Sequence, residues 1–322
     1  MTPTQGRRRY GRGTHYLGGH LVQLGLVGLG RMGANMRERL RAAGIEVLGF
    51  ARTDPSRDVS SLAELVERLS PPRSVWIMVP SGEATRDTVI QLARLLTGGD
   101  LVIDGGNSRY TDDQVHAELL ARAGIGYLDC GVSGGVWGRR NGYALMVGGS
   151  GEHVERVLPV FDALRPEGPR EEGFVHAGGV GAGHFAKMVH NGVEYGLMQA
   201  YAEGFELLEA AEVVTDVPAV LKAWQRGTVV RSWLLDLLVA ALAEDPKLTQ
   251  LRGWVADSGE GRWTVEEAIN HAVPAPVISA ALFARFASRQ SDSPAMRAVA
   301  ALRHQFGGHA VQQPASPDPA AN

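Results

Sequence analysis

Four polar residues at helical spacing, Lys187, His190, Asn191 and Glu194, are the first candidates for chemistry in this sequence. Residues three, four and seven apart share one face of a helix, so an amine, an imidazole, an amide and a carboxylate would point the same way. The residues between them are largely apolar and would bury the helix around this polar stripe. The stripe could hold a base and an acid. Equally, Lys187 and Glu194 could lie on a solvated face and add only a little helix stability.

A glycine-rich turn near the start of the globular sequence could position a cofactor beside such a stripe. Residues 22–28 are typical of a short apolar strand, the helix after them ends at about Gly44, and residues 45–50 form a second predicted strand. Glycines in this setting permit a tight turn, a close approach of backbone to a pyrophosphate and close packing of helix on strand. We therefore predict dinucleotide binding by Gly28, Leu29, Gly30, Arg31, Met32 and Gly33.

The end of the second strand indicates which dinucleotide is preferred. An acidic residue there would form hydrogen bonds with the adenine ribose hydroxyls of NAD. Here the strand ends at Phe50 and is followed by Arg52 and Thr53, and Asp54 comes too late. Arg52 can pair with a 2′-phosphate and Thr53 can donate a hydrogen bond to it. We therefore expect NADP, with NAD possible. A solvated loop arginine is the alternative interpretation of Arg52.

Strands and helices continue to alternate as far as residue 178. Further strands are predicted at residues 74–80, 101–104, 126–130, 143–149 and 174–178, with helices at about 83–96, 112–123 and 152–164. The strands are near-continuous apolar runs, as in a sheet that is covered on both faces. The pattern predicts an α/β fold with a Rossmann-type, doubly wound and mostly parallel sheet.

The carboxyl ends of the strands are where an open parallel sheet binds its ligands. Val79, Pro80 and Asn107 are candidate cofactor contacts there, and the candidate substrate contacts are Asn107, Ser133, Gly134 and Gly135. Asn and Ser beside Gly are also ordinary turn formers, which leaves a second interpretation of Asn107 and Ser133.

Only helices are predicted after Gly183, which indicates a separate all-α domain. They lie at about 183–211, 217–226, 229–244, 253–257, 264–272, 277–289 and 296–306. The predicted organisation is an unstructured extension at 1–21, a dinucleotide-binding domain at 22–179, a helical substrate and dimerisation domain at 180–311 and an unstructured tail at 312–322.

The composition excludes several classes of protein. A chain of 322 residues with 44% hydrophobic and 21% charged residues is typical of a soluble globular protein. Its net charge of −3 and lack of long basic blocks argue against nucleic acid, and no apolar run is long enough for a membrane span. The single cysteine, Cys130, cannot form an internal disulfide and excludes a four-cysteine zinc site. We expect a cytoplasmic protein without a metal.

Six segments, spread from residue 22 to about residue 310, suggest a family. They are G-L-G-R-M-G at Gly28–Gly33, I-D-G-G-N-S at Ile103–Ser108, G-V-S-G-G at Gly131–Gly135, G-A-G-H-F-A-K-M-V-H-N-G-V-E-Y-G at Gly181–Gly196, V-V-R-S at Val229–Ser232 and R-H-Q-F-G-G-H at Arg303–His309. Together they resemble 6-phosphogluconate dehydrogenase (decarboxylating), in its shorter bacterial form, within the β-hydroxyacid dehydrogenase superfamily.

The resemblance implies a reaction and a role for each residue of the stripe. Lys187 would take the proton of the C3 hydroxyl of 6-phosphogluconate while hydride passes to the nicotinamide, and the resulting 3-keto acid would lose CO2. Glu194 would then protonate the enediol to release ribulose 5-phosphate, a step of the pentose phosphate pathway and of gluconate utilisation. Asn191 would orient the substrate, and His190 and Tyr195 would line the same site.

The resemblance also implies a phosphate site shared between subunits of a homodimer or homotetramer. Tyr195 and Arg231 would come from one subunit, and Arg303 and His309 from its neighbour. One departure stands out, because longer family members carry approximately K-G-T-G-K-W-T where this chain has S-G-E-G-R-W-T at residues 258–264. Glu260 is not suited to bind a phosphate, although Arg262 could substitute for a lysine.

Two other functions are compatible with parts of this pattern. A 3-hydroxyisobutyrate-type dehydrogenase, which does not decarboxylate, would share the glycines and Lys187. Glu194, Arg231, Arg303 and His309 argue against it, because a small unphosphorylated substrate needs neither a second acid nor these cations. A non-catalytic NADP(H)-binding regulatory protein is the other alternative, and the intact pair of Lys187 and Glu194 argues against that.

Overall fold

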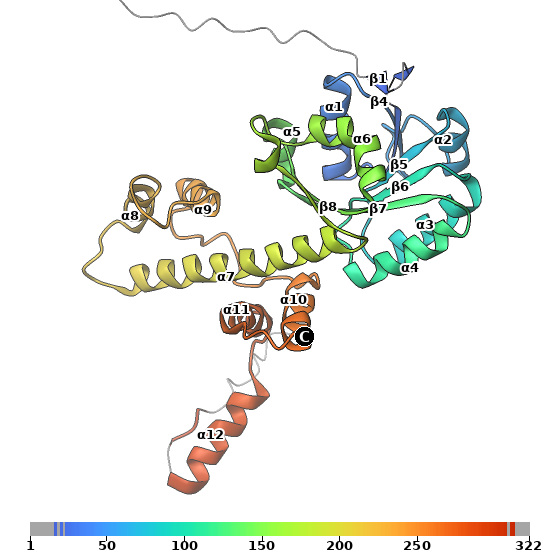
Figure 1. Ribbon diagram of the computed structural model, residues 1–322. Helices are drawn as coiled ribbons and strands as arrows, with labels where there is room; N and C mark the ends of the chain where they lie inside the picture. The colour runs from blue at the N-terminus through green and yellow to red at the C-terminus, as the bar shows by residue number, and fades with distance from the viewer. Residues whose placement is uncertain (1–15, 18–19, 22, 308–309, 313–322) are drawn as a thin grey trace, which may run out of the picture. The chain divides into compact units, whose positions relative to one another are not determined.

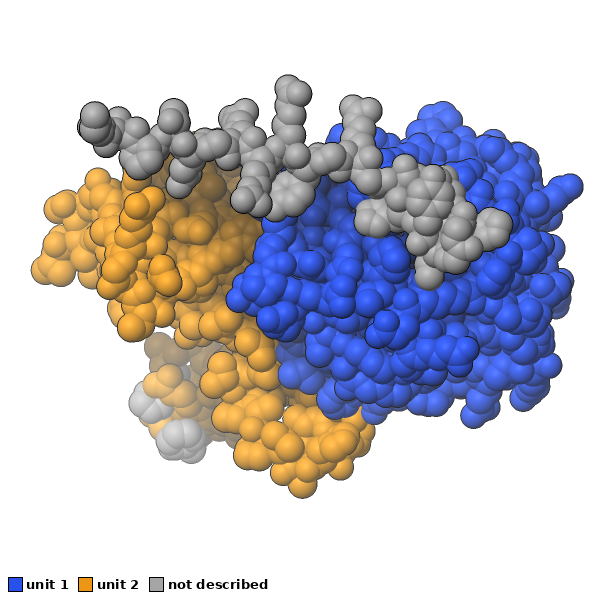
Figure 2. All heavy atoms as spheres, turned by 45° about the horizontal axis from the view of Figure 1, so that its top comes forward, with its two compact units in different colours: residues 1–192 blue, residues 193–322 orange. Residues whose placement is uncertain are grey.

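The computed structural model describes residues 16–17, 20–21, 23–307 and 310–312 of the chain (Figure 1). Its contacts divide the chain into two compact units, residues 1–192 and residues 193–322, which Figure 2 colours separately. The division falls inside the long helix α7 (Ala182–Ala210), so each unit includes part of that helix. The domain boundary between residues 179 and 180 stays a prediction.

Seven strands form the main sheet of unit 1, in the order β4-β3-β5-β6-β7-β8-β9. β7 and β8 pair antiparallel and all other neighbours are parallel, which confirms the mostly parallel, Rossmann-type sheet. The strands are β3 (Gln23–Val27), β4 (Glu46–Phe50), β5 (Ser74–Ile77), β6 (Leu101–Asp104), β7 (Gly126–Ser133), β8 (Ala144–Gly149) and β9 (Phe174–Gly178).

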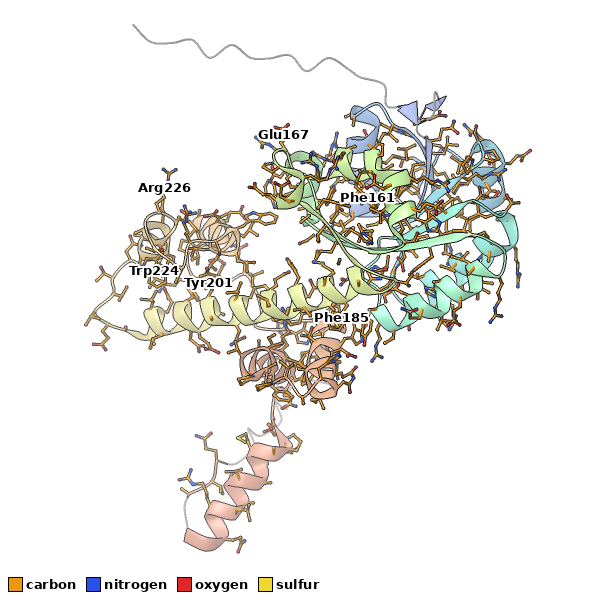
Figure 3. The ribbon with its side chains drawn as sticks, in the orientation of Figure 1. Phe161, Glu167, Phe185, Tyr201, Trp224 and Arg226 are labelled. Carbon is orange, nitrogen blue, oxygen red and sulfur yellow. The ribbon has the colours of Figure 1, made fainter. Side chains whose placement is uncertain are left out.

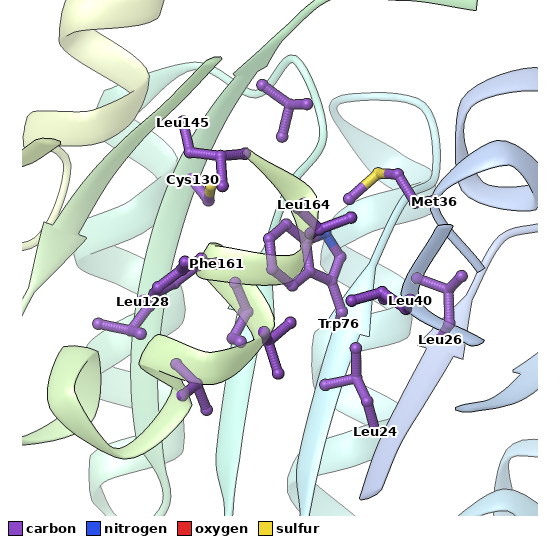
Figure 4. Close-up of a cluster of buried hydrophobic side chains, with 14 of the residues drawn as sticks. Leu24, Leu26, Met36, Leu40, Trp76, Leu128, Cys130, Leu145, Phe161 and Leu164 are labelled. Carbon is purple, nitrogen blue, oxygen red and sulfur yellow. The ribbon is translucent and has the colours of Figure 1, made fainter. Parts of the chain in front are cut away.

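Helices cover both faces of this sheet (Figure 1). One face carries α1 (Arg31–Ala42) and α6 (Gly151–Leu164), and the other carries α2 (Leu62–Arg68), α3 (Glu83–Leu95) and α4 (Tyr110–Ala121). Figure 4 shows the buried cluster on the first face, in which the rings of Trp76 and Phe161 meet edge to face with centroids 5.8 Å apart. All residues of β5 and β6 are buried, as the apolar runs predicted.

Several features of unit 1 differ from the sequence-based expectation, and one of them is β5, which ends at Ile77 instead of Pro80. β7 continues to Ser133 instead of ending at Cys130, because its last residues pair with β8. Helix α2 was not predicted, although a capping pattern precedes it. The Ser61 hydroxyl accepts a hydrogen bond from the Glu64 amide at 3.1 Å, and the Glu64 carboxylate accepts one from the Ser60 amide at 2.8 Å.

Short elements complete unit 1 among the described residues. The 3₁₀ turns η1 (Gly135–Trp137) and η2 (Arg170–Glu172) flank the sheet, and α5 (Gly138–Asn141) follows η1. β1 (Tyr16–Leu17) and β2 (His20–Leu21) pair antiparallel within the stretch expected to be unstructured. The remaining residues of that stretch, and residues 313–322, lie outside the described residues.

Unit 2 is helical, as predicted. It contains the end of α7 and the helices α8 (Val217–Trp224), α9 (Trp233–Glu244), α10 (Glu260–Asn270), α11 (Pro276–Ala287) and α12 (Pro294–Gly307). α9 begins four residues later than predicted because the Ser232 hydroxyl caps it, accepting the Leu235 amide at 3.1 Å. None of the helices in the described part of the chain is long and apolar enough to cross a membrane.

The predicted helix at residues 253–257 is wrong. These residues form no helix, and side chains bind the backbone of the segment instead. The Arg285 guanidinium donates to the Ala256 carbonyl at 3.1 Å, and the Asp257 carboxylate accepts the Gly259 amide at 3.3 Å. These contacts satisfy polar backbone groups that a helix would have paired within itself. α10 also begins at Glu260, four residues earlier than predicted.

The buried cluster of unit 2 is small. It comprises Val217 and Leu221 of α8 with Leu235 and Leu242 of α9, and partly buried side chains pack around it. Tyr201 and Trp224, labelled in Figure 3, belong to that surround. Several large apolar side chains of the other helices of this unit are exposed, among them Ile269, Val277 and Phe283.

Candidate active site

The turn between β3 and α1 has the shape that a pyrophosphate needs. Gly28 adopts a φ of +98°, and a Cβ there would collide with the Met78 carbonyl oxygen. A Cβ on Gly33 would collide with the Gly28 carbonyl oxygen, so the helix packs directly on the turn. A Cβ on Gly30 would meet nothing within 4 Å, and no side chain caps α1. The first amides of α1 are therefore available to an anion, which fits a dinucleotide.

The topology of the sheet brings the predicted cofactor residues to one edge. β3 lies between β4 and β5, so the strand order reverses beside it, which is where such sheets bind dinucleotides. The glycine turn follows β3, Arg52 and Thr53 follow β4, and Val79 and Pro80 follow β5. These three groups lie at neighbouring strand ends.

The loop after β4 leaves Arg52 and Thr53 exposed. Asp54 turns back into its own loop, where its carboxylate accepts the Ser56 amide at 2.7 Å. The buried Arg37 donates to the Ser56 carbonyl at 2.7 Å and holds the loop against α1. Arg52 makes no side-chain hydrogen bond or ion pair with the residues that the structure describes. A cation and a hydroxyl are thus presented at this strand end, and no carboxylate is.

The buried carboxylate of Asp104 holds the loop after β6 in place by hydrogen bonds. Asp104 accepts the Gly106 amide at 2.9 Å and the Ser108 hydroxyl at 2.8 Å. Ser108 is therefore engaged in holding the loop. The neighbouring Asn107 is exposed, and its side-chain oxygen accepts a hydrogen bond from the side-chain nitrogen of Asn191 at 3.2 Å.

Five of the predicted site residues lie within one chain of contacts in unit 1. Lys187 is only 8% exposed, and its amine lies 3.3 Å from His190 Nδ1. The other ring nitrogen of His190 lies 3.4 Å from the Ser133 hydroxyl. Asn191 joins His190 to Asn107. A buried amine beside an imidazole and two amides can move a proton and orient a hydroxylated substrate.

Glu194 and Tyr195 lie farther along α7, in unit 2. Glu194 is half-buried and follows Lys187 by seven residues on the helix. Tyr195 is buried, and its hydroxyl donates to the Glu260 carboxylate at 3.3 Å. The Arg285 guanidinium lies 3.4 Å from the centroid of the Tyr195 ring. Burial raises the pKa of Tyr195, so its hydroxyl remains a hydrogen-bond donor at neutral pH.

The segment that departs from the longer family members is built into unit 2. Glu260 is buried and accepts hydrogen bonds from Tyr195 and from the Ser258 hydroxyl. Arg262 pairs with Asp257, and its guanidinium lies 4.4 Å from the centroid of the Phe286 ring. Arg262 would have to leave these contacts to substitute for a phosphate-binding lysine.

The predicted phosphate-binding cations are exposed in unit 2. Arg231 lies just before α9 and Arg303 lies on α12. Neither guanidinium has a hydrogen-bond or ion-pair partner among the described residues. His309 lies outside them. Gly134 and Gly135 follow β7 with φ of +143° and +54°, and a Cβ on Gly135 would meet nothing within 4 Å.

Sequence reasoning missed a group of buried polar residues under the start of α7. Asp104, Asp113, Asp129 and His184 are all at most 1% exposed. A signal was present, because Asp104 and Asp129 interrupt otherwise apolar strands and His184 lies three residues before Lys187. Atoms of Asp104, Asp113 and His184 lie within 4.8 Å of one another, close enough to be considered for a metal ion.

Family models cover most of the chain. Residues 23–166 match the NAD-binding domain of 6-phosphogluconate dehydrogenase, and residues 183–315 match the 6-phosphogluconate dehydrogenase C-terminal domain.

Individual relatives agree with these matches. An NAD(+)-dependent, decarboxylating 6-phosphogluconate dehydrogenase of Haloferax volcanii is 44% identical over 300 residues, which are 90% of this chain and 98% of the relative. Among solved structures, the 6-phosphogluconate dehydrogenase of Plasmodium falciparum has a TM-score of 0.74 at 26% identity, over 93% of this chain and 67% of that one. The 3-hydroxyisobutyrate dehydrogenase of Mycobacterium tuberculosis has a TM-score of 0.66 at 25% identity, over 88% and 100%.

Proposed function

This chain belongs to the 6-phosphogluconate dehydrogenase family, and from that membership we propose that it oxidises and decarboxylates 6-phosphogluconate to ribulose 5-phosphate and CO2. The observation that carries the proposal is the buried Lys187 in contact with His190, which Asn191 links to Asn107. This group supplies a base and substrate-orienting amides on the same unit as the dinucleotide turn.

The first step is oxidation at C3 of the substrate. Lys187 takes the proton of the C3 hydroxyl as hydride leaves C3, and a nicotinamide dinucleotide held at the glycine turn would supply the hydride acceptor. Asn107 and Asn191 can hold neighbouring hydroxyls, and His190 can relay a proton between Lys187 and Ser133.

The second step is the loss of CO2 from the 3-keto acid. The bond between the carboxylate carbon and C2 breaks, and its electron pair forms the enediol while Lys187 returns its proton to the C3 oxygen. Glu194 then protonates the carbon that lost CO2 while Lys187 takes the proton of the enediol hydroxyl on the neighbouring carbon, which gives the ketone ribulose 5-phosphate. A small 3-hydroxy acid that is oxidised without decarboxylation would not need this second acid.

We also propose that the active form is a homo-oligomer whose copies share the substrate site. Large apolar side chains of α11 and α12 are exposed, among them Phe283, Met296 and Leu302 at 60–66%. A soluble chain rarely leaves so much apolar surface uncovered, and a second copy would cover it. Arg303, on the same helix as Met296 and Leu302, would then be presented to the substrate phosphate of the neighbouring copy.

The cofactor that we propose is NADP, with NAD as a possible substitute. The exposed Arg52 and Thr53 support NADP because they can bind a 2′-phosphate at the end of β4. The relative from Haloferax volcanii is described as NAD(+)-dependent, whereas the Plasmodium falciparum enzyme was solved with NADP+. Activity in the cytoplasm is part of this proposal.

Supplying the purified protein with 6-phosphogluconate and either dinucleotide tests the function. We expect the absorbance of the reduced nicotinamide and the released CO2 to grow in equal amounts. The similarity to 3-hydroxyisobutyrate dehydrogenase makes that activity the second candidate, and reduction without CO2 would favour it. Binding of the dinucleotide without any turnover would instead indicate a non-catalytic protein.

A further inference from the structure

The first turn of α7 is attached to the sheet of unit 1 by buried charged groups. Asp129, in the middle of β7, accepts the Gly181 amide at 2.7 Å on one carboxylate oxygen and the His184 amide at 2.9 Å on the other. One carboxylate thus accepts hydrogen bonds from two amides at the helix N-terminus, and its negative charge interacts favourably with the positive end of the helix dipole. The carboxylate is fully buried, so these bonds are shielded from water.

A second attachment joins α7 to α4. His184 Nδ1 lies 2.9 and 3.0 Å from the two carboxylate oxygens of Asp113, and the Tyr127 hydroxyl donates to the same carboxylate at 2.8 Å. Burial alone would lower the pKa of His184, but Asp113, Asp104 and Asp129 together raise it to about 9. Burial raises the pKa of Asp113 to about 6, against the effect of His184. At neutral pH the two groups therefore form an ion pair.

Direct backbone packing leaves α7 little freedom to shift. A Cβ on Gly131 of β7 would collide with Lys187 Cβ, and a Cβ on Gly183 would collide with the Met146 carbonyl oxygen of β8. The helix therefore touches both strands without an intervening side chain. Lys187 lies about one turn beyond His184, where its Cβ faces Gly131 of β7 directly.

We propose that Asp113, Asp129 and His184 are positioning residues for the proton transfer by Lys187. None of them reaches the substrate in this proposal. They fix the first turn of α7 on β7 and α4, and this turn sets where the Lys187 amine stands relative to the loops after β6 and β7. Catalysis depends steeply on such placement, because a small displacement of a reacting group costs much of the rate. The proposal rests on the role of Lys187 in the proposed function.

Replacing Asp129 by Asn, with Asp100→Asn as the matched control, tests the proposal. Asp100 is also a buried carboxylate that accepts two backbone amides, those of Arg73 at 2.6 Å and Thr97 at 2.9 Å, but it lies at the opposite end of the sheet. We expect both variants to lower Tm. Only Asp129→Asn should lower kcat, by about 10- to 100-fold, with the KM for the dinucleotide within about 2-fold. Equal losses of kcat in both variants would overturn the proposal.

The ion pair provides a second, independent test. Asp113→Asn and His184→Gln each leave the other charge buried and unpaired, so each should lower kcat and Tm. The double variant replaces the pair by two amides that can still bond, and we expect it to recover kcat by at least about 5-fold over the poorer single variant. A double variant no better than either single one, in folded protein, would contradict a role in positioning. The variants at Asp113 and His184 also test the proposal if Asp129→Asn does not fold.

The placement of Lys187 can be measured without turnover, which separates this proposal from the proposed function. Acylation of Lys187 by a small anhydride, followed by mass spectrometry, should be several-fold faster in Asp129→Asn and Gly131→Ala than in Asp100→Asn and the unaltered protein. Unchanged reactivity would overturn the proposal even if the enzyme is active. Prolonged dialysis against EDTA should leave both activity and reactivity unchanged. A loss that an added divalent ion restores would instead make Asp104, Asp113 and His184 a metal site.

Discussion

The two units differ in how completely they bury their own apolar side chains. Unit 1 contains two large buried clusters, one on each face of its sheet, whereas the described part of unit 2 contains one cluster with four buried members. Large apolar residues such as Leu251, Val277 and Leu302 are more than 60% exposed in unit 2. Each such side chain forgoes about 1.5–3 kcal/mol that burial would supply. Unit 1 therefore buries more of its apolar side chains than the described part of unit 2, whose exposed ones we propose to be covered by a second copy.

The predicted site residues of the two units also differ in how many contacts they make. In unit 1 the residues that we assign to chemistry contact one another and are backed by buried strands and carboxylates, as Lys187, His190 and Asn191 show. In unit 2 the predicted phosphate ligands are exposed, with Arg231 just before α9 and Arg303 on α12. The exposure of these cations is compatible with our proposal that copies of the chain share the substrate site. Substitutions in each unit test this difference.

Lys187→Met should have the largest effect and act on unit 1 alone. Removing a general base lowers kcat by about 10²- to 10⁴-fold, and the glycine turn that holds the dinucleotide is untouched. Single-turnover hydride transfer measures the first quantity, and fluorescence titration with the reduced dinucleotide measures the second. Lys222→Met, at an exposed position on α8, is the control and should be neutral. Near-normal hydride transfer in Lys187→Met would remove the assignment.

Val299→Asp combined with Leu302→Asp should separate the copies. Both side chains are exposed on α12, at 46% and 66%, so a carboxylate there harms the single copy little but would be costly in an apolar interface. We expect a monomer by sedimentation, activity reduced by more than about 10-fold, and dinucleotide binding by unit 1 unchanged.

Hybrid oligomers provide the control for this variant. Mixing Arg303→Ala protein with Lys187→Met protein should restore part of the activity, because one shared site of the hybrid would then combine Lys187 of the first variant with Arg303 of the second. An active monomer, or confirmed hybrids without activity, would argue against a shared site.

Arg52→Ala should change cofactor choice and nothing else in unit 1. Loss of a charge-assisted contact to the 2′-phosphate should raise the KM for NADP by about 10- to 100-fold and leave the KM for NAD within about 2-fold. Steady-state kinetics with each dinucleotide measures both. The neighbouring Arg57→Ala is the control, since its guanidinium is engaged by the Arg52 carbonyl at 2.8 Å. Equal effects on the KM values for NADP and NAD would show that Arg52 does not bind the 2′-phosphate.

Glu260→Gln should have the smallest effect and act on unit 2. The amide keeps the shape of the side chain and can still accept from Tyr195, but it removes a buried negative charge close to a proposed phosphate ligand. We expect the KM for 6-phosphogluconate to fall about 2- to 5-fold with kcat unchanged. Glu267→Gln, another buried carboxylate of α10, is the control. A rise in KM would mean that Glu260 itself binds a substrate hydroxyl.

Local patterns in the sequence predicted those parts of the fold that depend on neighbouring residues. The glycines at Gly28 to Gly33, the alternation of strands and helices and the polar stripe of α7 could all be recognised because backbone geometry and helical periodicity act over a few residues. Helix α2 could have been found from the capping pattern at Ser61. The helix predicted at residues 253–257 was wrong because Arg285, far along the chain, binds the backbone there.

The tertiary structure alone decided which polar residues meet. Asp113, Asp129 and His184 come from α4, β7 and α7, and no spacing in the sequence indicates that their side chains would be buried together. The contacts of Glu260 with Tyr195 likewise depend on how α10 packs within unit 2. The family, the dinucleotide turn and the candidate base could be recognised without the structure, because each depends on short local motifs. How that base is held in place was decided by packing, because it joins residues that are distant in the chain.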